Sequence, residues 1–124
     1  MPVMDETNRL GDWLKWEEDN LYSRRQVLVA AGQKLATGTV VGVITASGKV
    51  TQLAPAAEDG SQNAAGVLLH SVDATAADAP GVILAREAIC ADRGLVWPAG
   101  ITAPQKAAAL SQLENLGILV REGA

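Results

Sequence analysis

The chain has 124 residues, the size of one domain. Apolar residues make up 48% of it but aromatic residues only 3%, with three Trp, one Tyr and no Phe, so the core has to be built from Val, Ile, Leu and Ala. The formal net charge of −4 arises within residues 1–22, where six acidic residues accompany two basic ones, and a neutral body without clustered cations argues against binding to DNA or RNA.

The single cysteine, Cys90, and the single histidine, His70, limit the chemistry that the chain can carry. One cysteine forms no intramolecular disulfide, and one Cys with one His does not make a zinc site. We therefore expect no catalytic residue, no metal and no cofactor. We interpret His70 as an ordinary strand residue and Cys90 as a small buried one. With no apolar run near the ~18 residues of a membrane span and no signal-peptide pattern, we expect a product of a reducing cytoplasm that binds no membrane.

The first segment, residues 1–22, is polar and acidic, yet it holds three of the four aromatic residues. The spacing of its apolar residues fits one face of a helix, but Gly11 and Asn20 weaken a helix, and we interpret the segment as an arm that is at most partly ordered when free. Tryptophans in such a segment suit docking on a partner, while packing against the chain's own body stays open. The candidate contact residues of the arm are Leu10, Trp13, Leu14, Trp16, Leu21 and Tyr22.

Residues 23–98 are expected to be mainly β structure, because runs of β-branched residues alternate with Gly-containing turns. Ser47-Gly48 predicts a hairpin, and the polar stretches 55–63 and 73–80 predict loops. The expected strands are 25–30, 38–45, 49–53, 65–72 and 81–91, the last interrupted at Arg86 and Glu87.

A single helix is expected near the C-terminus. Thr102 is placed to cap it, Pro104 lies in the first turn, where its missing N–H costs nothing, and Gly117 follows Leu116, where a left-handed residue ends a helix. Residues 118–120 then form a short final strand. The sequence thus predicts a mainly β domain, β-rich α+β, with one C-terminal helix.

The order and spacing of these elements resemble the lambda-type head decoration proteins of tailed bacteriophages. The resemblance runs over most of the chain and is weakest in residues 1–12. The segments that carry it are Tyr22-Ser23-Arg24-Arg25, QVLVAAGQ, LATGTVVGVITASGKVTQL, Asp59-Gly60 before AAGVLLHSVDA, GVILAREAIC, LVWPAG and LGILVR.

The resemblance implies a structural protein of the virion and no enzyme. It implies a β-rich decoration domain, residues 23–124, and a capsid-binding arm, residues 1–22, that adds a strand to a sheet of the major capsid protein. Three copies would form a homotrimer at three-fold points on the exterior of the expanded capsid and stabilise it against the pressure of packaged DNA. Assembly would take place in the cytoplasm of the bacterial host, without nucleic acid or membrane as a partner.

Two other functions stay open. One is a β-module of a phage tail or baseplate, which would use the same arm on a different partner. The other is a prosthetic-group carrier domain, because Lys49 follows Ser47-Gly48 at a predicted hairpin, although Lys49 lacks the flanking Asp or Met of such carriers. A ligand-binding barrel is less attractive, because the body is poor in aromatic residues.

Overall fold

The computed structural model describes residues 13–19 and 23–122, and β structure dominates them. The predicted fold class, a mainly β domain with one C-terminal helix, is confirmed. The strands are β1 (Leu14–Glu17), β2 (Arg24–Val29), β3 (Gln33–Leu35), β4 (Val40–Val43), β5 (Val50–Gln52), β6 (Gly66–Leu68), β7 (Val72–Ala74), β8 (Ala79–Leu84), β9 (Ala88–Ala91) and β10 (Ile118–Arg121), and the helical elements are the 3-10 turn η1 (Asp92–Gly94) and the helix α3 (Ala103–Asn115).

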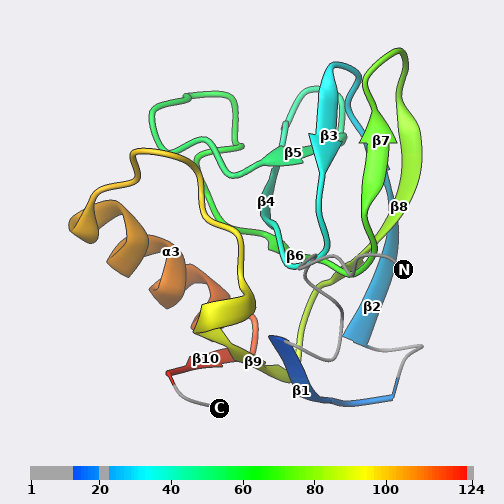
Figure 1. Cartoon of the computed structure of the whole chain (residues 1–124). Helices are drawn as coiled ribbons and strands as arrows, with labels where there is room; N and C mark the ends of the chain where they lie inside the picture. The colour runs from blue at the N-terminus through cyan, green and yellow to red at the C-terminus, as the bar shows by residue number, and fades with distance from the viewer. Residues whose placement is uncertain (1–12, 20–22, 123–124) are drawn as a thin grey trace, which may run out of the picture.

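Five strands close a small barrel in the order β2-β5-β4-β6-β8 (Figure 1). Strands β2 and β8 pair antiparallel along their whole length, while β2 and β5 close the barrel through one parallel pair, Val29 with Val50. The barrel interior is filled by aliphatic side chains, as the composition requires, among them Val29, Val41, Val50, Leu68 and Ile83. Branched aliphatic residues suit such a narrow interior.

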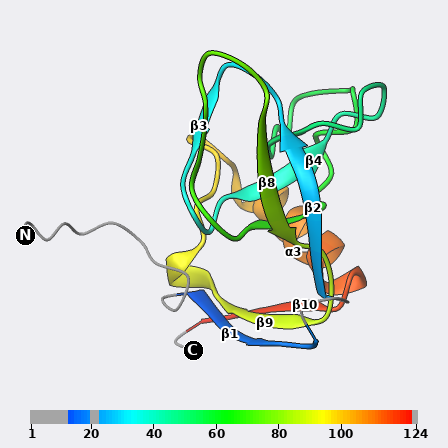
Figure 2. The same cartoon turned by 90° about the vertical axis from the view of Figure 1, so that its right-hand side faces the viewer.

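A second sheet, in the order β1-β9-β10, lies below the barrel (Figures 1 and 2). Its central strand β9 pairs antiparallel with β1 and parallel with β10, so residues from the start and the end of the described chain flank the same strand. One face of this sheet packs on α3 and the barrel, where Trp13, Cys90, Leu113 and Ile118 belong to one buried cluster. The described part of the N-terminal segment thus lies in the same sheet as the last strand, with β9 between them.

The hairpin and cap signals of the sequence form as predicted, whereas the loop expected over 73–80 is shorter, because β7 ends at Ala74 and β8 starts at Ala79. At the hairpin between β4 and β5, the N–H of Gly48 donates to the carbonyl of Ile44 over 2.7 Å. Thr102 caps α3 by accepting from the N–H of Gln105, whose side chain accepts in return from the N–H of Thr102. Gly117 ends the helix region with a φ of +84°, a conformation that glycine adopts without strain.

Two predicted strands are divided in the structure. The strand expected over 65–72 is wrong as a single element, because β6 ends at Leu68 and β7 starts at Val72. The fully buried Leu69 lies in this break, where its carbonyl accepts from Thr37 Oγ1. A continuous apolar run gives no periodic signal from which such a break can be predicted. The run 81–91 is interrupted as expected, with Glu87 between β8 and β9 at a φ of +54°.

Candidate functional site

Three of the six candidate contact residues, Trp13, Leu14 and Trp16, lie in the described part of the N-terminal segment. Leu14 opens strand β1, which replaces the helical turn that the apolar spacing allowed. Residues 13–19 are therefore part of the fold of the body. The other candidates, Leu10, Leu21 and Tyr22, lie outside the described residues.

Trp13 is fully buried in the chain's own core, the alternative that the sequence left open. Its indole Nε1–H donates a hydrogen bond to Thr37 Oγ1 over 3.1 Å, and the Thr37 hydroxyl in turn donates one to the carbonyl of Leu69. The indole packs in the cluster that contains Leu113 and Ile118. The apolar surface of Trp13 is buried and its N–H is hydrogen-bonded inside the body. Trp13 therefore anchors the start of β1 to the body and offers little surface to a partner.

A β-bulge at Lys15 separates the side chains of Leu14 and Trp16. Leu14 is registered with Cys90 and Trp16 with Ile89, so the strand β1 has one residue more than β9 between these pairs. Without the bulge, Leu14 and Trp16 would lie on the same face of the sheet. With it, Leu14 packs against the core cluster, whereas Trp16 is 49% exposed on the other face.

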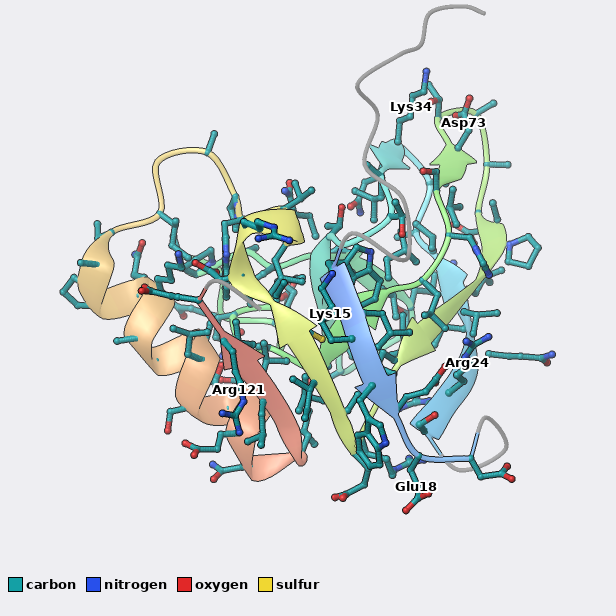
Figure 3. All side chains as sticks on the ribbon, turned by 60° about the horizontal axis from the view of Figure 1, so that its bottom comes forward. Lys15, Glu18, Arg24, Lys34, Asp73 and Arg121 are labelled. Carbon is teal, nitrogen blue, oxygen red and sulfur yellow. The ribbon has the colours of Figure 1, made fainter. Side chains whose placement is uncertain are left out.

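The end of β1 is fastened by charged groups. The Glu17 carboxylate accepts from Arg24 Nε over 3.0 Å and from Ser23 Oγ over 2.7 Å, and Ser23 is fully buried. The hydrogen bond from Arg24, more than that from Ser23, lowers the pKa of Glu17 below its ordinary value. The N–H of Glu18 donates to the carbonyl of Glu87 over 3.0 Å. Figure 3 shows Glu18 and Arg24 at the end of the sheet where β1 leads to β2.

The residues considered for other chemistry have ordinary surroundings. Burial raises the pKa of the Cys90 thiol to about 12, which suppresses the thiolate that a nucleophile needs. Lys49, the candidate carrier lysine, forms an ion pair with Asp78, whose carboxylate lies 2.6 Å from its Nζ. Across residues 13–19 and 23–122, no three His, Cys, Asp or Glu side chains gather where they could hold a metal ion. Within the same ranges, no helix has the length and apolarity to cross a membrane.

Two residues that hold the segment in place, Ser23 and Thr37, were not predicted from the sequence. Thr37 is 24 positions from Trp13, and Ser23 contacts a carboxylate six positions earlier. Hydrogen bonds between such distant positions leave no periodic or motif signal. Only the cluster of Trp residues in an acidic segment marked this part of the chain.

Comparison with models of protein families gives a match. The family model of the bacteriophage lambda head decoration protein D matches residues 3–118. This range includes the barrel, β1, β9 and α3. A search of curated proteins finds no match.

Proposed function

The chain belongs to the family of the bacteriophage lambda head decoration protein D, and from this premise we propose that it binds the outside of the expanded capsid at three-fold sites and stabilises it against packaged DNA. As a member of this family it is a phage head decoration protein, a structural component of the virion capsid. The match over residues 3–118 is the observation that carries the proposal. The role needs a contact surface and no reaction.

In the proposed complex the N-terminal segment lies on the major capsid protein. Residues 1–12 precede Trp13, and a fully extended chain of that length spans up to ~40 Å. Such an arm can add a strand to a capsid sheet, with main-chain hydrogen bonds for affinity and alternate side chains for specificity. Leu10, Trp16, Leu21 and Tyr22 supply the apolar contacts, while Trp13 and Leu14 fix the point from which residues 1–12 leave the body.

The proposed assembly is a homotrimer. Three arms on one trimer bind together, so the second and third contacts form at high effective concentration and total affinity exceeds that of one arm by orders of magnitude. A modest contact by each copy therefore suffices. Assembly takes place in the cytoplasm of the bacterial host, and the mature protein lies on the capsid exterior.

The alternatives gain no support from a specific observation. A carrier domain needs a lysine that extends freely at a hairpin, whereas Lys49 is ion-paired with Asp78. A tail or baseplate module would share the fold and the arm but not the binding to heads. Binding to heads therefore separates it from the proposed function.

The test is sedimentation of the purified protein with expanded, undecorated heads of its own phage. Full-length protein should bind saturably, at three copies per three-fold site, and should raise the temperature at which DNA-filled heads release their DNA. A variant without residues 1–12 keeps Trp13 and β1, so it should fold normally and bind much more weakly. Full-length protein that does not cosediment with heads would contradict the proposal and favour the tail module.

A further inference from the structure

Three apolar side chains form a row across the sheet β1-β9-β10. Trp16 is registered with Ile89, and Ile89 with Leu119, so the three side chains project on one side, one from each strand. The neighbours of this row along β9 and β10, which are Ala88, Cys90 and Ile118, are buried in the core cluster. Because side chains alternate along a strand, Ile89 and Leu119 lie on the face opposite to the core. We call Trp16, Ile89 and Leu119 the outer row.

The outer row lies on a face that no described element covers. In Figures 1 and 2 the barrel and α3 lie on the other side of this sheet, and Figure 3 looks directly onto its outer face. Trp16 is 49% exposed, and Ile89 and Leu119 are half-buried by their neighbours. Leu28, the other large apolar residue that is highly exposed in the described ranges, is on the barrel strand β2.

The bulge at Lys15 makes this row. Without the extra residue, Trp16 would follow Leu14 to the core face, and the outer face would have only Ile89 and Leu119. The bulge interrupts the hydrogen bonds between β1 and β9, and it leaves Trp16, a large apolar side chain whose exposure to water is unfavourable, 49% exposed. Trp, Ile and Leu side by side are typical of the apolar centre of an interface, where a large aromatic side chain contributes most on binding.

We propose that the outer row binds the capsid shell directly, so that the sheet β1-β9-β10 is the side of the body that faces the major capsid protein. This inference rests on the proposed function. Its partner is an apolar patch of the shell, with mixed charges at its rim, because Lys15, Glu18 and Arg121 at the rim of the outer face carry both signs (Figure 3). The contact is therefore only weakly sensitive to salt, in contrast to one formed by the acidic arm.

Continuity of the chain favours the shell over a second copy as the occupant. Residues 1–12 continue directly into Trp13 and β1, so the arm leaves the body at the edge of this sheet. When the arm lies on the shell, the strand from which it extends is held against the same surface. The outer row is then covered by the shell in the same step, and each copy adds a body contact to its arm contact.

The experiment measures binding of four full-length proteins to expanded, undecorated heads at two salt concentrations. They are the unsubstituted protein, Trp16→Ala, Leu119→Asp and the matched control Leu28→Asp, which places the same charge at an exposed leucine of the barrel. We expect Trp16→Ala and Leu119→Asp each to raise the dissociation constant at least ten-fold, and Leu28→Asp to change it less than two-fold. Circular dichroism and sedimentation mass of each free protein report fold and assembly.

The outcomes separate the inference from the proposed function. Row variants that keep their fold and sedimentation mass but bind heads weakly support the inference. If Leu119→Asp disturbs the fold, Trp16→Ala alone decides. Row variants that bind as tightly as the unsubstituted protein overturn it and leave the capsid role intact. A lower sedimentation mass of the free protein in the row variants alone also overturns it, because the outer row would then form a contact between copies of the chain. Unsubstituted protein that does not bind heads overturns the proposed function, and the inference with it.

Discussion

Replacing Trp13 with alanine should destabilise the free protein far more than replacing Trp16, three positions later. Trp13 is fully buried, and a tryptophan removes about 200 Å² from water, worth about 5 kcal/mol at ~25 cal/mol per Å². Measured truncations of buried Phe and Trp cost about 3–5 kcal/mol, because the cavity that remains collapses only in part. Thr37 also loses the donor of its 3.1 Å hydrogen bond. We expect a loss of about 4 kcal/mol.

Trp16 is the matched control, because the same side chain is removed three positions later, within the strand that Trp13 precedes. It is 49% exposed, so its truncation should cost about 1 kcal/mol. A third variant, Trp13→Phe, keeps most of the packing and loses the hydrogen bond to Thr37, and should lie between the two.

Urea unfolding followed by far-UV circular dichroism measures all three variants without depending on tryptophan fluorescence. One protein concentration is used throughout, since assembly adds a concentration-dependent contribution to stability. The free energies of unfolding of Trp13→Ala and Trp16→Ala should differ by at least 2 kcal/mol. Equal losses would refute the reasoning, because β1 would then not be fastened to the body by Trp13.

Three further predictions concern single groups. Glu17→Gln should lower the free energy of unfolding by about 1 kcal/mol at pH 7. Because Arg24 lowers the pKa of Glu17 in the folded protein, this loss should be complete above the ordinary glutamate pKa and should vanish as the pH falls through the lowered pKa. Acid titrations of both proteins measure it, and a loss that does not change with pH would contradict the ion pair. Thr102→Ala should lower the free energy of unfolding by about 1 kcal/mol, measured by urea titration, because Gln105 loses the acceptor of its N–H, and an unchanged value would argue against the cap. Cys90, whose pKa burial raises to about 12, should react with a disulfide reagent only as fast as the protein unfolds, and rapid labelling of the native protein would show that the sheet opens locally.

The elements that local chemistry determines were predictable from the sequence. The hairpin at Ser47-Gly48 follows from turn residues between β-branched runs, and the helix follows from Thr102, Pro104 and Gly117, whose cap positions have few alternatives. Each of these signals lies within a few positions of the element that it specifies. The composition likewise predicted a core of aliphatic residues, and the interior of the barrel is filled by them.

The pairing of distant segments was not predictable in the same way. Nothing in Ile118–Arg121 indicates that it pairs parallel with β9, and no local signal divides β6 from β7. The same limit applies to the candidate site. The sequence identified Trp13 and Trp16 as unusual, but only the bulge at Lys15 and the register with Ile89 separate a core residue from an exposed one. One inserted residue reverses the face of a side chain, and a single sequence does not show it.

Electron cryomicroscopy of expanded heads decorated with the purified protein tests the central claim most directly. The account predicts density for three copies at each three-fold point of the outer surface, with the sheet β1-β9-β10 towards the shell, Trp16 at the contact and residues 1–12 continuing along the capsid. Bare three-fold points, or copies attached through the barrel with Trp16 in solvent, would contradict it.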